Sequence, residues 1–160
     1  MARIQKITTF LWFDTQAEEA AAHYMKVFKD SRIVHVSRYG NGMPLPEGTA
    51  MTVEFELAGV PFIALNAGPL FTFTEAISLM VSCDDQIEID RMWAHLTSDG
   101  GSESACGWLK DKYGLSWQVV PQRFMEIIRT GTPDQQGRVM GAMMQMRKFD
   151  IAAIEAAARG

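Results

Sequence analysis

The hydrophobic and polar positions of this chain repeat one arrangement twice. Apolar runs at residues 7–13 and 76–82 have the length of buried strands, and each is followed by a polar turn and a helical pattern. The two turns, at residues 13–18 and 83–88, share the same order of apolar, acidic, polar, Gln, apolar and Glu positions. They lie about half the chain apart, which predicts an internal duplication.

Both turns also carry signals for the start of a helix. Thr15 with Glu18, and Asp85 with Glu88, place a side-chain acceptor at the expected N-cap and an acid on the following turn. We therefore expect each helix to be capped from within its own segment.

Further strand patterns follow each predicted helix. They lie at residues 33–39, 51–57 and 60–66 in the first half, and near 102–106, 108–110 and 115–120 in the second. The order predicts an α+β fold made of two βαβββ modules, each with an apolar sheet face to cover. We place the paired modules at residues 1–121, the first at about 4–70 and the second at 71–121.

Beyond Pro121 the pattern becomes helical. Residues 123–129 form one candidate helix, Thr132 followed by Pro133 predicts the start of a second that runs to about residue 147, and Asp150 fits the cap of a third. Because no low-complexity linker separates them from the rest, we expect residues 122–160 to be a helical extension packed on the same domain.

Composition excludes several classes of partner. The 160 residues are 48% hydrophobic, enough for a good core, and the formal charge of -4 argues against nucleic acid and anionic membranes. No apolar run is long enough for a signal peptide or a membrane span. Two cysteines fit free thiols in a reducing compartment, so we expect a cytoplasmic protein.

The last predicted strand holds the most informative side chain. Gln118 stands between Trp117 and Val119, where a primary amide is costly unless it is hydrogen-bonded. Asn66 ends the corresponding strand of the first half. Each amide is either a structural clasp or a contact for a ligand.

Several segments together resemble a known family. The pieces are residues 9–14, 64–69, 85–90 and 106–111, and the spacing Asp111-x-x-Gly114-x-x-Trp117-Gln118. They are similar to the PhnB-like branch of the glyoxalase/bleomycin-resistance (vicinal oxygen chelate) superfamily, often labelled 3-demethylubiquinone-9 3-methyltransferase proteins. The resemblance runs from about residue 4 to 121, and the tail looks like the extension of one subgroup.

The resemblance implies sheets curved around a central cavity, commonly within a homodimer. Metal-dependent relatives bring ligands from the first and last strands of each module, often with a Glu where this chain has Gln118. Here those strands offer mainly hydroxyls and amides, with Glu75 the one nearby anion, while His23 and His95 are expected on the polar sides of helices. We therefore expect no cofactor, with a divalent metal as the disfavoured alternative.

Two sets of residues are candidates for a site. For binding they are Trp12, Asn66, Trp108 and Gln118, with core packing as the alternative for the tryptophans. For catalysis they are Cys106 and Glu75, with a structural thiol as the alternative for Cys106.

The resulting hypothesis is a protein that binds a small aromatic or amphipathic molecule without a metal. The alternative is an enzyme of the same superfamily: a metal-assisted lyase, isomerase or dioxygenase, or the methyltransferase of the family label. The chain shows no glycine-rich loop between a strand and its helix for a nucleotide-like methyl donor. A slip of one residue in a strand would exchange all side chains that face the cavity.

Overall fold

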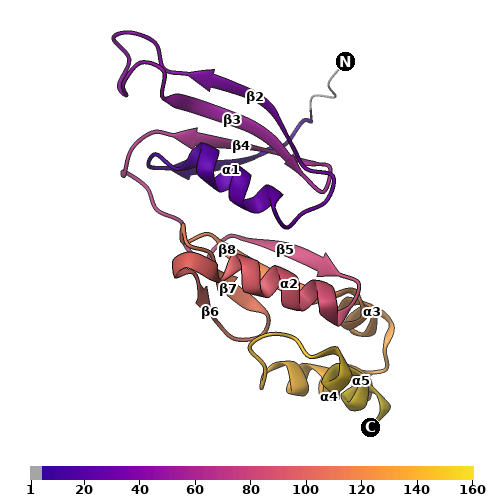
Figure 1. The fold of residues 1–160 in the computed structure, drawn as a ribbon. Helices are drawn as coiled ribbons and strands as arrows, with labels where there is room; N and C mark the ends of the chain where they lie inside the picture. The colour runs from indigo at the N-terminus through magenta and orange to yellow at the C-terminus, as the bar shows by residue number, and fades with distance from the viewer. Residues whose placement is uncertain (1–4) are drawn as a thin grey trace. The chain divides into compact units, whose positions relative to one another are not determined.

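The computed structural model describes residues 5–160, so the predicted start of the first module at about residue 4 lies outside it. The chain divides into two compact units, Met1–Thr72 and Phe73–Gly160. Each unit contains one four-stranded sheet with a helix across one face (Figure 1). The α+β fold of two βαβββ modules followed by C-terminal helices is confirmed.

The first unit has the predicted order of elements. They are β1 (Thr9–Phe13), α1 (Ala17–Met25), β2 (Arg32–Arg38), β3 (Ala50–Leu57) and β4 (Val60–Asn66). In space the strands run β1-β4-β3-β2, with β1 parallel to β4 and the other pairs antiparallel. The small side chains of Ala17, Ala20 and Ala21 are fully buried and let α1 pack closely on β3 and β4.

The cap of α1 differs from the prediction. The N-cap is Gln16, and it forms no side-chain capping bond, so the Thr15–Glu18 box is wrong. Instead the side-chain oxygen of Asn66, at the end of β4, accepts the backbone N–H of Ala17 at 2.8 Å. A helix start needs an acceptor for its free N–H groups, and here the sheet supplies it.

The second unit repeats the topology and adds the helical extension. Its elements are β5 (Ser78–Cys83), α2 (Gln86–Leu96), η1 (Ser98–Gly100), β6 (Ser102–Glu103), β7 (Trp108–Lys110), β8 (Ser116–Pro121), α3 (Gln122–Thr130), α4 (Pro133–Met143) and α5 (Ile151–Arg159). The strands run β5-β8-β7-β6, with β5 parallel to β8. Here the predicted cap is confirmed, because Asp85 accepts the N–H of Glu88 at 2.8 Å.

The extension is bound to the rest of the second unit by backbone hydrogen bonds. Cys106 and Gly107, in the turn before β7, donate to the carbonyls of Met146 at 2.9 Å and Arg147 at 2.7 Å. The predicted caps at Thr132 and Asp150 form, although α4 ends at Met143, short of residue 147. None of the helices among the described residues is long and apolar enough to cross a membrane.

Gly107 shows how closely the extension packs. Its φ is +82°, and a Cβ added there would lie 2.5 Å from Cε2 of the buried Phe149. We expect Gly107→Ala to lower the free energy of unfolding by about 2–4 kcal/mol, because it adds a clash to the cost of a left-handed backbone.

The matched control is Gly114→Ala, since Gly114 has a φ of +85° and an added Cβ would meet nothing within 4 Å. It should cost only about 1–2 kcal/mol. Urea denaturation followed by circular dichroism measures both. Equal losses would contradict the packing of Phe149 against Gly107.

Candidate functional site

Each sheet has one face under a helix, and its other face carries side chains that range from exposed to buried. Side chains alternate between the faces along a strand, and residues paired across strands share a face. In β8, Trp117 and Val119 are buried on the side of α2, so Gln118 between them points to the opposite side. We call the side of the second sheet away from α2 the open face of unit 2.

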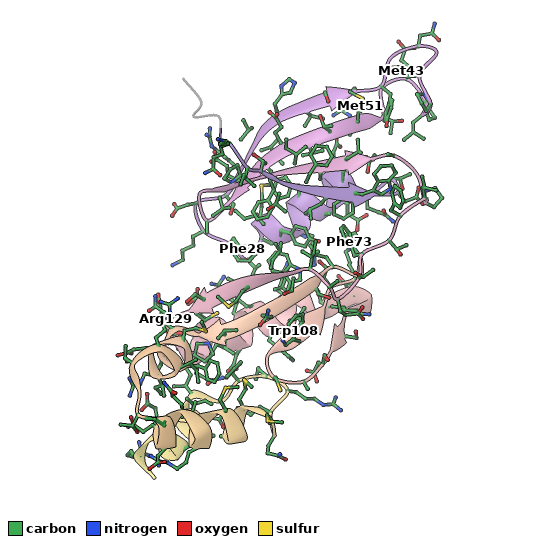
Figure 2. The ribbon with its side chains drawn as sticks, turned by 180° about the vertical axis from the view of Figure 1, so that it is seen from behind. Phe28, Met43, Met51, Phe73, Trp108 and Arg129 are labelled. Atoms are coloured by element: carbon green, nitrogen blue, oxygen red, sulfur yellow. The ribbon has the colours of Figure 1, made fainter. Side chains whose placement is uncertain are left out.

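Two predicted binding residues meet on this open face. Gln118 pairs directly with Trp108 of β7 on one side and with Met80 of β5 on the other. Figure 2 views the sheet from the side away from α2 and marks Trp108 there. Trp108 and Gln118 are half-buried and Met80 is 50% exposed, so a partly accessible aromatic ring, amide and thioether lie in one row.

The Gln118 amide has one partner within the unit. Its Nε2 donates to Oγ of Ser78 on β5, at 3.0 Å. This contact links the two parallel strands and fixes the direction of the amide. The amide oxygen can accept further hydrogen bonds, so the side chain is held in one direction while part of its hydrogen-bonding capacity stays available.

A second row of polar side chains lies next to the first. Ser78 pairs with Ser116, and Ser116 pairs with Lys110, so all three share the open face. The ammonium of Lys110 forms an ion pair with Glu75, and both side chains are partly exposed, at 43% and 61%. Glu75 was a predicted catalytic candidate, whereas Ser78, Ser116 and Lys110 were not among the predicted site residues, because their place on this face depends on strand pairing.

The ion pair sets the ionisation of Glu75. The hydrogen bond from Lys110, and to a smaller degree a backbone hydrogen bond and the charge of Lys110, lower the pKa of Glu75 from its usual value. A lowered carboxyl pKa favours the folded state above the unfolded pKa, and this contribution disappears as the pH falls through the folded pKa. Glu75 is therefore a carboxylate at neutral pH and poorly suited to act as a general acid.

The other two predicted binding residues belong to the first unit. Trp12 lies on the face of its sheet away from α1, where its indole donates to the carbonyl of Gly68 at 2.9 Å and its ring meets Phe71 edge-on at 4.9 Å. Asn66 lies on the helix face, 2% exposed. Besides Ala17, its amide reaches the carbonyl of Ala50 at 3.0 Å, so it is a structural clasp.

Strand pairing explains why the two amides face differently. Phe13 pairs with Asn66, while its counterpart in the repeat, Cys83, pairs with Pro121. The counterpart of Asn66 is therefore Pro121, and Gln118 corresponds to Ile63, which pairs with Phe10. Asn66 and Gln118 are on corresponding strands, as predicted, but on opposite sides of their sheets.

The surroundings of the two cysteines favour structural thiols over reactive ones. Cys106 is half-buried with a φ of 59°, and its backbone N–H donates to the carbonyl of Met146. Cys83 is buried, and burial together with the nearby Glu88 and Asp84 raises the pKa of its thiol to about 12. A thiol with so high a pKa is protonated at neutral pH and is a poor nucleophile.

The described residues offer little to a metal ion. Residues 5–160 contain no group of three or more His, Cys, Asp and Glu side chains that could hold one.

His23 was predicted on the polar side of its helix, and this prediction is wrong. His23 is 6% exposed within α1 and packs edge-on against Tyr24.

Asp111 holds the turn between β7 and β8 and the side chain of Trp117, on the helix side of the second sheet. Its buried carboxylate accepts the N–H groups of Tyr113 at 2.9 Å and Leu115 at 3.0 Å, and the indole N–H of Trp117 at 2.9 Å. The predicted turn chemistry of residues 111–114 is confirmed, with Gly114 at a φ of +85°. The indole contact was not predicted, and it holds Trp117 on the helix side.

Comparison with known proteins gives a family and a fold. The profile of the 3-demethylubiquinone-9 3-methyltransferase family matches residues 5–120. The PhnB protein from Bacillus cereus, which carries the same methyltransferase name, is 40% identical, with 73% of this chain and 99% of that chain covered and a TM-score of 0.68. No curated protein matches the chain.

More distant structures share the fold alone. Protein PA1353 from Pseudomonas aeruginosa is 19% identical, with a TM-score of 0.61 over 74% of this chain and 98% of that chain. The fosfomycin resistance protein FosX from Mesorhizobium loti is 11% identical, with a TM-score of 0.51 over 79% of this chain and 100% of that chain.

Removing the Asp111 carboxylate should unfold the turn between β7 and β8. We expect Asp111→Ala to lower the free energy of unfolding by at least about 3 kcal/mol, since three N–H groups lose a charged acceptor in a buried place. The indole N–H resonance of Trp117 should also shift or broaden in the NMR spectrum. Glu47→Ala, an exposed acid in a loop, is the control and should change neither. An unchanged Trp117 resonance in Asp111→Ala would contradict this role.

Proposed function

This chain belongs to the 3-demethylubiquinone-9 3-methyltransferase family, and we propose that it binds a small aromatic or amphipathic molecule without a metal. The carrying observation is the pairing of Trp108 with Gln118 on the open face of unit 2. A flat indole offers contact area to a ring, and an oriented amide offers one hydrogen bond beside it. The face needs no further group to bind such a molecule.

The absence of a metal in this proposal rests on ligand chemistry. In metal-binding members of the superfamily a Glu often stands where this chain has Gln118, and a neutral amide is a weak ligand for Zn, Fe or Ni. The Gln118 amide is also engaged with the Ser78 hydroxyl. The neighbouring carboxylate, Glu75, is paired with Lys110.

The family name supplies a second candidate, the transfer of a methyl group to a demethylated ubiquinone precursor. The family match favours it. Against it, the turns after β1 and β5 carry Asp14-Thr15-Gln16 and Asp84-Asp85 where a nucleotide-like methyl donor would need glycines for close approach. We therefore place binding first and treat methyl transfer as the reaction to test against it.

A homodimer in the cytoplasm completes the proposal. Both cysteines are free thiols, as in a reducing compartment. Large apolar side chains are exposed on the described surface, among them Phe10 at 55%, Leu70 at 72% and Phe71 at 60%. Such exposure is typical of surfaces that bind a partner, and a second copy is the partner that the family resemblance implies.

A dimer predicts a concentration-dependent mass in sedimentation equilibrium. We expect a species of twice the chain mass at micromolar concentration. Phe71→Glu, which places a charge on an exposed ring position, should shift the equilibrium toward monomer. Ile87→Glu on α2 serves as a control at an apolar site that is more exposed, at 78% against 60% for Phe71. A single-chain mass at all concentrations would remove the dimer from the proposal.

The binding proposal predicts a specific response to an aromatic metabolite panel. At least one compound should raise the Tm of the wild-type protein, and Trp108→Ala should weaken its binding at least tenfold, or about 1.4 kcal/mol, through loss of ring contact. Ile87→Ala, on the helix side, should bind as the wild type does. Isothermal titration calorimetry gives the affinities.

Two further measurements separate the alternatives. Metal analysis of the purified protein should give less than one equivalent of any transition metal, and a stoichiometric metal would overturn the metal-free proposal. Incubation with S-adenosylmethionine and a demethylated quinol should give no methylated product. Product formation that is lost in Trp108→Ala would replace binding by methyl transfer.

A further inference from the structure

The open face of unit 2 carries a row of hydroxyl and ammonium donors. Ser78, Ser116 and Lys110 follow one another across β5, β8 and β7 in direct register, and Ser102 of β6 continues the row by pairing with Lys110. Paired residues share a sheet face, so these four side chains begin on the same side. The row contains three hydroxyls and one positive charge.

Ser116 is the member of the row that calls for an explanation. It is 1% exposed, and its hydroxyl finds no hydrogen-bond partner among residues 5–160. Buried hydroxyl groups in proteins are nearly always hydrogen-bonded, and an unmet one destabilises the fold. A hydroxyl beside an ammonium group is suited to donate to an oxygen that the ammonium also attracts.

The chain already places one such oxygen near the row. The carboxylate of Glu75 pairs with Lys110, so an oxyanion is accepted at this ammonium. The Glu75 side chain is 61% exposed, and an exposed ion pair contributes little to stability. A ligand oxyanion could therefore displace Glu75 from Lys110 at small cost.

The donor row lies next to the row of Met80, Gln118 and Trp108. The two rows are two residues apart along each strand, which corresponds to about 7 Å. A ring in contact with Trp108 would thus place an acid group within reach of Lys110 and Ser116, whether the group is attached to the ring directly or through one carbon atom.

From this juxtaposition we propose that the molecule bound on the open face is an aromatic or amphipathic acid. Its carboxylate or phosphate oxygens bind Lys110 and the hydroxyls of Ser116 and Ser78, and its apolar body lies against Trp108. Glu75 occupies the ammonium when the ligand is absent. The inference rests on the proposed binding function and specifies the class of ligand.

Matched pairs of acid and neutral amide test the proposal. The probes are benzoate with benzamide, phenylacetate with phenylacetamide, and phenyl phosphate, each titrated calorimetrically into the full chain. At least one acid should bind at least tenfold more tightly than its amide. Added salt should weaken the acid and leave the amide unchanged, because only the acid is attracted by charge.

Variants assign the selectivity to residues. Lys110→Met should reduce the acid-to-amide ratio to about one, whereas Lys110→Arg should retain it. Glu75→Gln should tighten acid binding at least threefold by removing the competing carboxylate. Ser116→Ala should weaken the acid several-fold while the Tm stays the same or rises, since the variant removes an unmet buried hydroxyl.

The outcomes separate this inference from the proposed function. If acids and amides bind equally and Trp108→Ala weakens both, binding on the open face stands and the acid class is overturned. Retained selectivity in Lys110→Met, or no gain in Glu75→Gln, also overturns it. If no acid binds while a neutral compound of the metabolite panel does, the acid class is overturned and the proposed function stands; if no compound of either set binds, both fail.

Discussion

The carboxylate of Asp111 is the contact on which the candidate site depends. It is 2% exposed and receives hydrogen bonds from Tyr113, Leu115 and the indole of Trp117. These bonds close the turn between β7 and β8 and hold Trp117 on the helix side of the sheet. Because neighbours along a strand alternate, Gln118 must then face the opposite side, and its partner Trp108 with it.

The two units use their duplicated framework for different ends. In the first, the Asn66 amide is directed inward and caps α1, and the backbone carbonyl of Asn66 accepts the hydroxyl of Tyr39 at 2.5 Å. In the second, Asp85 caps α2 from its own segment, so the end of β8 needs no amide for that purpose. On the face of the second sheet away from α2, the side chains of Gln118 and Lys110 are partly exposed, whereas Ser116 is buried.

The helical extension supports β7, although it lies outside the region that the family profile matches, which ends at residue 120. Its backbone carbonyls at Met146 and Arg147 accept the N–H groups that precede β7, and Phe149 fills the space beside Gly107. Gln86 at the start of α2 binds the backbone of Phe149 and Ile151, both at 2.9 Å. Trp108 therefore follows a segment that is anchored on both sides, which favours a pre-formed surface.

The sequence by itself determined the duplicated modules, the turn at residues 111–114 and the caps at Asp85, Thr132 and Asp150, because each of these depends on neighbours along the chain. Only the tertiary structure decided that Asn66 caps α1 in place of Thr15, that Asn66 and Gln118 face opposite sides, and that Ser116 adjoins Lys110. Side chains alternate with a period of two, so their direction depends on which residues pair across the sheet. Those partners are distant in the sequence, and their pairing is fixed by packing of the whole unit.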